Sequence, residues 1–135
     1  MPYISQPIRQ ELQNIIKRHS HYIRGKVLDV GAGSFDRYSA LFTYDTYTKM
    51  DIAGIPNTDI EGIAEDIPSK DASYDSIVCT QTLSDVWNVS KAFSEFNRVL
   101  RTDGVLLLTS SFMDPLNEDV GEYWRFTPNA YRRLA

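Results

Sequence analysis

Residues 26–34 read KVLDVGAGS, an apolar run that ends in a turn with two glycines. The apolar run predicts a buried strand, because it is short and a glycine bounds it on each side. Gly31 and Gly33 allow a tight turn in which a ligand can approach bare backbone. We expect Ser34 to cap a helix over Phe35–Leu41, so that its N-terminal amides face that ligand. Such turns are also common structural punctuation, so this one alone does not define a site.

The segments around this unit alternate between strand and helix patterns. Strands are predicted at Lys26–Val30, Thr46–Ile52, Ile60–Ala64, Tyr74–Thr80 and Val105–Ser110. Further helices are predicted at residues 7–23, at Ser90–Leu100 and after Thr127, which would cap a helix that begins at Pro128. Because the central strands are apolar throughout, the pattern favours an α/β fold, a doubly wound parallel sheet with helices on both faces.

The bulk properties restrict the class of protein. The 135 residues predict a single domain, residues 1–135. A formal net charge of −4 disfavours a nucleic-acid partner, which usually meets a basic surface. Cys79 is the only cysteine, so no internal disulfide can form, which fits a cytoplasmic location; its apolar neighbours predict a buried thiol. No secretory signal, membrane span or metal site is expected.

Asp51 directs the interpretation towards a nucleoside ligand. It ends the second predicted strand, where a carboxylate can accept hydrogen bonds from ribose hydroxyls. A dinucleotide fingerprint would place a third glycine at position 36, but this chain has Asp36, whose charge is unfavourable beside a pyrophosphate. S-adenosylmethionine has no phosphate and carries two cationic groups, so Asp29 and Asp36 suit it better. Asp29 is equally well explained as a buried structural hydrogen-bonding group.

A set of motifs, in order over residues 25–112, resembles the class I S-adenosylmethionine-dependent methyltransferases, particularly the subgroup that methylates ubiquinone and other small molecules. The motifs are VLDVGAG at 27–33, MD at 50–51, AEDIP at 64–68, YDSIV at 74–78, EFNRVL at 95–100 and DGVLLL at 103–108. The resemblance implies a Rossmann-like sheet of order 3-2-1-4-5. It also implies the function, transfer of a methyl group from S-adenosylmethionine to a small-molecule acceptor.

The resemblance assigns roles along the cofactor. Gly31 and Gly33, with Thr80 and Gln81, would lie at its methionine end, near Asp29. Asp51 would hold the ribose and Ile52 would flank the adenine face. Asp66 would accept a hydrogen bond from the adenine amino group, and the amide of Ile67 would read the ring. Asp66 is also explained as a turn-forming residue before Ile67 and Pro68.

Three departures from the family pattern bear on function. Phe35 occupies the family's third glycine position, and Ser84-Asp85 replaces a Glu-His pair after the fourth strand. The final antiparallel hairpin of the family core is missing, so the chain is expected to be truncated at its C-terminus. An open fifth-strand edge would invite pairing, so we expect a homo-oligomer formed through the exposed sheet edge.

The catalytic residues are not identified by the sequence. Candidates for a general base are Asp85, Tyr123, His19 and His21, although His19 is expected to pack on the apolar face of the first helix. Within a C-terminal acceptor-side segment, residues 113–135, the aromatic stretch with Tyr123, Trp124 and Arg125 could line a substrate pocket or anchor the last helix. Two alternatives to a methyltransferase remain, an S-adenosylmethionine-binding domain without catalysis and an NAD-dependent oxidoreductase.

Overall fold

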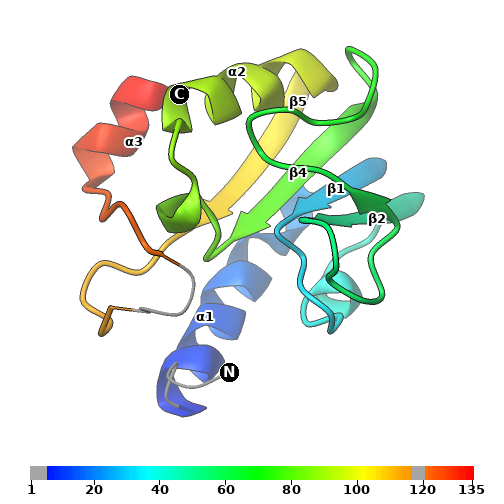
Figure 1. Cartoon of the computed structure of the whole chain (residues 1–135). Helices are drawn as coiled ribbons and strands as arrows, with labels where there is room; N and C mark the ends of the chain where they lie inside the picture. The colour runs from blue at the N-terminus through cyan, green and yellow to red at the C-terminus, as the bar shows by residue number, and fades with distance from the viewer. Residues whose placement is uncertain (1–5, 117–120) are drawn as a thin grey trace.

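A five-stranded parallel sheet forms the centre of the computed structural model, which describes residues 6–116 and 121–135 (Figure 1). The strands lie in the order β3-β2-β1-β4-β5, as predicted. Their bounds are Lys26–Val30 for β1, Thr46–Asp51 for β2, Ile60–Glu61 for β3, Tyr74–Thr80 for β4 and Leu100–Thr109 for β5. The central strands β1 and β4 have buried apolar residues on both faces, which is typical of a sheet covered on both sides.

Helices cover both faces of the sheet, as the sequence predicted. Helix α1 (Gln6–His19), continued by a 3₁₀ turn at Ser20–Tyr22, packs Ile16 against Val27 of β1 and Val78 of β4. Helix α2 (Val89–Val99) and helix α3 (Pro128–Leu134) lie over the opposite face, whose core includes Cys79. Figure 1 shows α1 on one side of the strands and α2 and α3 on the other. The predicted burial of the Cys79 thiol is confirmed, and that burial raises its pKa.

The starts of α2 and α3 follow the usual capping chemistry. The Asn88 side chain accepts a hydrogen bond from the amide of Lys91 at the start of α2. At the start of α3 the Thr127 hydroxyl accepts from the amide of Ala130, and Pro128 is the first helical residue. The predicted cap of the last helix is therefore confirmed.

The helix predicted at Phe35–Leu41 is wrong, because only a 3₁₀ turn, η2 (Ser39–Leu41), forms there. The Asp36 carboxylate accepts from both the amide and the hydroxyl of Ser39, which closes a tight local turn. The carbonyl of Ser34 accepts a hydrogen bond from the side chain of Asn57, not from a backbone amide of a following helix. The glycine turn therefore does not lead into a helix N-terminus.

Two strands differ from their predicted bounds by more than one residue. β3 contains two residues, and the chain then turns at an isolated bridge between Ile63 and Asp66. β5 begins at Leu100, five residues before the predicted start, with a register shift against β4 and a positive φ of 63° at Asp103. The charged residues of this early part masked the strand pattern. β5 lies at one edge of the sheet.

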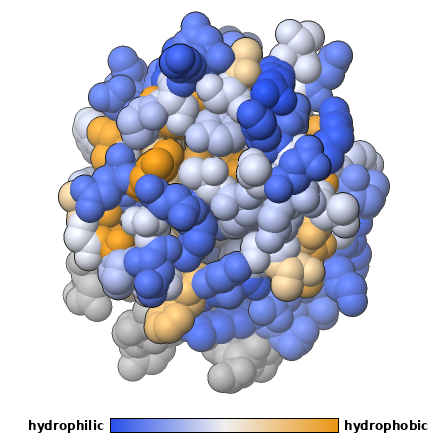
Figure 2. All heavy atoms as spheres, turned by 90° about the vertical axis from the view of Figure 1, so that its right-hand side faces the viewer, coloured by the Kyte–Doolittle hydropathy of each residue, from blue (hydrophilic) through white to orange (hydrophobic). Residues whose placement is uncertain are grey.

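The surface beside β2, on the right of Figure 1, carries mostly hydrophilic side chains with small separate hydrophobic areas (Figure 2). None of the helices in the described part of the chain is both long enough and apolar enough to cross a bilayer. Over the same residues, no three His, Cys, Asp or Glu side chains cluster in a way that would hold a metal ion.

Candidate functional site

The candidate site lies at the carboxyl ends of β1, β2 and β4, where the connections of an open α/β sheet diverge. Gly31, directly after β1, has a φ of 72°. A Cβ at this position would overlap Thr82 Oγ1 and Cγ2 and would lie 2.7 Å from Thr82 Cβ. The loops after β1 and β4 therefore meet so closely that only glycine fits.

Gly33 has the same left-handed backbone but a different environment. Its φ is 70°, and no atom lies within 4 Å of the position that a Cβ would take. Its amide donates to Asp51 Oδ2 at 2.7 Å. The amides of Gly31 and Ala32 both donate to the Met50 carbonyl, at 2.9 and 3.1 Å. The turn is thus anchored to the end of β2 while the space above Gly33 stays open.

Asp51 ends β2 with its carboxylate directed back towards the glycine turn. Besides holding the amide of Gly33, it accepts from the amide of Ile52 through Oδ1 at 2.8 Å. Ile52 is 55% exposed, although it is a large apolar side chain. A carboxylate beside an exposed apolar side chain matches a ribose site with an adenine face next to it.

Asp29 is a buried carboxylate on β1, with 5% of its surface exposed. The Tyr47 hydroxyl donates to Asp29 Oδ2 at 2.7 Å, whereas Oδ1 is buried and accepts no hydrogen bond from the described residues. Burial raises the pKa of Asp29 to about 6, and the Tyr47 hydrogen bond and the charge of Lys49 only partly oppose this. An unpartnered buried oxygen is costly, so Asp29 is a candidate to receive a ligand's hydrogen bond.

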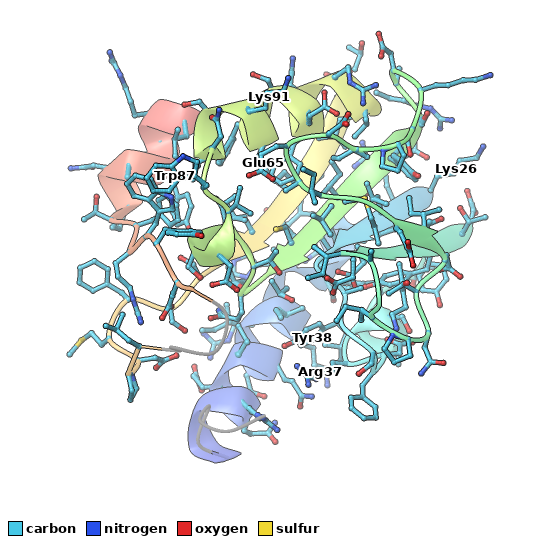
Figure 3. The ribbon with its side chains drawn as sticks, viewed as in Figure 1. Lys26, Arg37, Tyr38, Glu65, Trp87 and Lys91 are labelled. Atoms are coloured by element: carbon cyan, nitrogen blue, oxygen red, sulfur yellow. The ribbon has the colours of Figure 1, made fainter. Side chains whose placement is uncertain are left out.

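Thr80 and Gln81 follow from the end of β4 into the same region. Thr80 is buried, and its side chain lies close to that of Tyr38, which Figure 3 places near α1. Gln81 has a φ of 54°, in the left-handed region, and its amide donates to the Thr109 carbonyl. Its side chain accepts from Ser111 Oγ at 2.5 Å. Strained backbone of this kind often occurs at functional sites.

The loop with Asp66 and Ile67 lies beside helix α2. Asp66 is exposed, and its amide donates to the Ile63 carbonyl at 3.0 Å. Ile67 is buried, and its amide already donates to Glu95 Oε2 at 2.8 Å. The Ile67 amide is therefore engaged within the protein, whereas the Asp66 side chain faces solvent.

The predicted acceptor side contains an exposed aromatic cluster of Trp87, Tyr123 and Trp124. The ring of Trp87 lies 5.2 Å from that of Tyr123 and 5.8 Å from that of Trp124, between centroids. The amides of Tyr123 and Trp124 donate to the Ser84 carbonyl, and Trp124 Nε1 donates to the Val86 carbonyl. This fastens residues 123–124 to the loop after β4. Figure 3 shows Trp87 beside α3, well separated from Tyr38.

Charged groups adjoin this cluster. Arg125 pairs with Glu122 at 2.8 Å, and one of its nitrogens, Nη1, is buried without a hydrogen-bond partner among the described residues. Asp85 is half-buried; burial and the nearby charge of Glu122 raise its pKa. A raised pKa suits a proton acceptor, which keeps Asp85 a candidate base. Residues 117–120 of the predicted acceptor-side segment lie outside the described residues.

His19 was expected in the core, and this expectation is wrong. It is the last residue of α1, its side chain is exposed, and its Nδ1 hydrogen bonds with the Ile15 carbonyl at 2.9 Å. His21 lies two residues further on and stacks loosely on Tyr22. The apolar helix face instead uses Ile16, which is fully buried.

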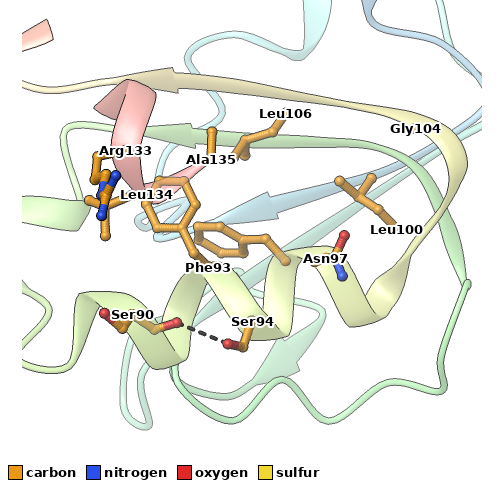
Figure 4. Close-up of a pocket in the computed structure, with 11 residues that line it drawn as sticks. Ser90, Phe93, Ser94, Asn97, Leu100, Gly104, Leu106, Arg133, Leu134 and Ala135 are labelled. Carbon is orange, nitrogen blue, oxygen red and sulfur yellow. Dashed lines mark hydrogen bonds between the residues drawn. The ribbon is translucent and has the colours of Figure 1, made fainter. Parts of the chain in front are cut away.

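Two grooves lie away from the glycine turn. One runs between α2, β5 and α3 and is lined by Phe93, Asn97, Leu106 and Leu134 (Figure 4). The other lies between Phe112 and the start of α3. Neither groove includes a residue of the glycine turn or Asp51, Asp66 or Thr80. The polar and glycine residues at the strand ends, rather than either groove, define the candidate site.

Three kinds of site residue were not predicted from the sequence. Tyr47 holds Asp29, Thr82 packs against Gly31, and Glu95 with Arg98 holds the loop after Asp66. The signal for Tyr47 is its place in β2, which pairs Tyr47 with Val27 and therefore puts it on the Asp29 face of the sheet. The others depend on loops whose path the sequence pattern does not fix.

Residues 28–108 match the model of the methyltransferase domain family, which is more than half of the chain. The chain therefore belongs to the methyltransferase domain family. The sheet order and flanking helices agree with this Rossmann-like class. No curated protein matches the chain.

Solved structures share the fold at low sequence identity. The YcgJ protein from Bacillus subtilis has a TM-score of 0.73 and 20% identity, over 93% of this chain and 66% of that one. An S-adenosylmethionine-dependent methyltransferase from Thermotoga maritima has a TM-score of 0.56 and 18% identity, over 75% and 53%. The methyltransferase CalH, in complex with S-adenosylhomocysteine, has a TM-score of 0.53 and 16% identity, over 75% and 35%. The chain thus spans less than two thirds of each of these proteins.

Proposed function

We propose that this chain binds S-adenosylmethionine at the carboxyl ends of β1, β2 and β4 and transfers its methyl group to a small-molecule acceptor. The observation that carries the proposal is the buried carboxylate of Asp29, whose Oδ1 has no partner in the described part of the chain. This orphaned acceptor lies on β1, two residues before Gly31 and the turn whose face is open at Gly33. A cationic ligand with an N–H donor suits such a position.

The other residues fit the rest of the same ligand. Asp51 would accept from the ribose hydroxyls, and the exposed Ile52 would cover one face of the adenine. The exposed Asp66 would accept from the adenine amino group. Thr80 and Gln81 would flank the methionine end with Asp29. The set spans the ligand from its ammonium to its base.

S-adenosylmethionine supplies an electrophilic methyl group when it is bound. The residues of the chain then need to hold an acceptor atom about 3 Å away, in line, and to exclude water. Tyr123, Trp124 and Arg125 are the proposed acceptor side, since the loop after β4 holds them. Asp85 is the proposed base where an acceptor must lose a proton, because its raised pKa favours taking one.

The two alternatives to a methyltransferase, a binding domain and an oxidoreductase, are not equally well supported. A binding domain without catalysis is the second candidate, because Ser84-Asp85 stands where the family pattern has a Glu-His pair. An NAD-dependent oxidoreductase is disfavoured, since no helix N-terminus follows the glycine turn to receive a pyrophosphate. A cytoplasmic location stays a prediction, which rests on the single cysteine. Self-association through the β5 edge also stays a prediction, which rests on the position of β5 at the edge of the sheet.

The proposal is tested by calorimetric titration with S-adenosylmethionine, S-adenosylhomocysteine and NADH. The wild-type chain is expected to bind the first two and not NADH. Asp51→Asn is expected to weaken S-adenosylhomocysteine about 10-fold or more, since a carboxylate that accepts from buried hydroxyls is lost.

Asp59→Asn is the matched control for that substitution. The Asp59 carboxylate accepts a hydrogen bond from a backbone amide of β2, that of Lys49, at 2.7 Å. Asp59 is exposed and lies outside the candidate site. Its variant is expected to bind like the wild type. Equal affinity in Asp51→Asn and the wild type would remove Asp51 from the ribose site.

A further inference from the structure

The loop that begins at Asp66 is fastened to α2 through both backbone polar atoms of Ile67. Glu95 Oε2 accepts from the Ile67 amide at 2.8 Å. Arg98 Nη2 donates to the Ile67 carbonyl at 2.9 Å. Two α2 side chains, one turn apart, therefore fix the residue that follows Asp66. Figure 3 places Glu65, which precedes Asp66, below the helix that carries Lys91.

Arg98 uses its whole guanidinium in this contact. Its Nε and Nη2 donate to the two oxygens of Glu95, each at 2.7 Å. Its Nη1 donates to the Ser69 carbonyl at 2.7 Å and to Asp71 Oδ1 at 2.9 Å. With the bond to Ile67, the five N–H groups of Arg98 meet five acceptors on α2 and the loop. A lysine could not reproduce this planar arrangement.

The pair is charged at all ordinary pH values. Hydrogen bonds from Arg98 lower the pKa of Glu95 to about 2, and the amide of Ile67 contributes in the same direction. Glu95 and Asp71 raise the pKa of Arg98 in turn. Charged hydrogen bonds with this geometry are stronger than neutral ones, so the loop is held firmly between residues 67 and 71.

Asp66 itself lacks such support. Its side chain is exposed, and within the described part of the chain no hydrogen bond holds its carboxylate. Its position therefore depends on the backbone on either side, the bridge to Ile63 before it and the clamped Ile67 after it. A small change in the clamp would move the carboxylate relative to the base it is proposed to read.

We propose that Glu95 and Arg98 are positioning residues that give the site its selectivity for adenine by fixing the backbone next to Asp66. This inference rests on the proposed function. It assigns a role in base recognition to helix α2, which contributes no residue to the proposed contacts with the ligand.

The test compares two ligands on each variant, S-adenosylhomocysteine and S-inosylhomocysteine, in which an oxygen replaces the 6-amino group. The wild type is expected to prefer the adenine ligand about 10-fold or more, since Asp66 gains a donor in one case and faces an oxygen in the other. Arg98→Met is expected to bring this ratio close to one while the affinity for the inosine ligand stays the same. Arg98→Lys is a milder change, so its adenine-to-inosine affinity ratio is expected to lie between those of the wild type and Arg98→Met.

Arg101→Met is the matched control. Arg101 also donates to a carboxylate, from Nη1 to both oxygens of Asp75 at 2.8 and 2.9 Å, and from Nε to the Ala72 carbonyl, but among the described residues no hydrogen bond joins it to Ile67 or Ser69. Its variant is expected to keep the wild-type ratio. An unchanged ratio in Arg98→Met and Arg98→Lys, or an equal loss of both ligands, would overturn the inference. A wild type that binds neither ligand would overturn the proposed function and this inference with it.

Discussion

The Asp29→Asn variant is expected to bind S-adenosylmethionine about 10- to 100-fold more weakly than the wild type, the effect of losing a charged hydrogen bond. Asparagine keeps the shape of the side chain and can still accept from Tyr47. It removes the negative charge that Oδ1 would present to the ligand's ammonium. Calorimetric titration of both proteins at pH 7.5 measures the difference, and equal affinities would exclude Asp29 from the site.

The pH dependence of binding provides a second readout for the same residue. The pKa of Asp29 is raised to about 6, so the wild type holds the charged form above that value and loses it below. Affinity is therefore expected to fall by up to about tenfold for each pH unit below 6, since only the charged form attracts the ammonium. Asp29→Asn should show no such fall. Tyr47→Phe removes the hydrogen bond that lowers this pKa, so the fall should begin at higher pH.

Stability should change with pH in the opposite sense to binding. The folded chain binds the Asp29 proton more tightly than the unfolded chain, whose carboxyl has the ordinary value of 3.8. The stabilising contribution of this proton is fully present below about pH 4 and is lost as the pH rises through 6, a total of about 3 kcal/mol. Denaturant unfolding of the wild type and Asp29→Asn across this range measures it, and parallel curves would contradict the assignment.

Gly31→Ala is expected to lower the free energy of unfolding by about 3 kcal/mol or more. This loss combines the strain of an alanine in the left-handed backbone region with the overlap of its Cβ and the Thr82 side chain. The φ at Gly31 is 72°, and a Cβ there would meet the Thr82 side chain. Thr82→Gly in the same chain should recover part of the loss, because it removes the overlapping atoms but not the strain. Equilibrium unfolding in urea measures these differences.

Gly33→Ala is the matched variant, because its φ of 70° is nearly the same but the space around it is empty. We expect a loss of only about 1 kcal/mol of stability, from the left-handed backbone alone. Its Cβ would instead enter the space where the ligand approaches, so affinity for S-adenosylhomocysteine should fall about 10-fold or more. Equal losses of stability and equal affinities in Gly31→Ala and Gly33→Ala would contradict this difference between the two glycines.

The central strands were predictable because their signal is strong and local. Lys26–Val30 and Tyr74–Thr80 are short apolar runs, and the structure gives both the predicted bounds. The absence of a helix at Phe35–Leu41 was not predictable. Two polar contacts form there in place of a helix capped by Ser34. Asp36 closed a turn with Ser39, and Asn57 took the Ser34 carbonyl. The second of these joins residues 23 positions apart, which no local pattern records.

The candidate site was predictable to the extent that its residues lie in ordered motifs at strand ends. Asp29, Gly31 and Asp51 come together because parallel strands end at the same edge. The partners of these residues are contributed by neighbouring strands and helices, as with Tyr47 and Thr82. Their roles depend on strand register and loop path, which become visible only when the chain is folded.

The central claim is that S-adenosylmethionine binds at the carboxyl ends of β1, β2 and β4. Its most direct test is to titrate the chain with S-adenosylhomocysteine and to record the amide chemical shifts during the titration. We expect saturable shifts at Gly33, Ile52, Asp66 and Gln81, which surround the proposed ligand. No shifts are expected at Ser94 or Gly104, in the groove between α2 and β5. Shifts confined to that groove, or no saturable shifts at all, would contradict the claim.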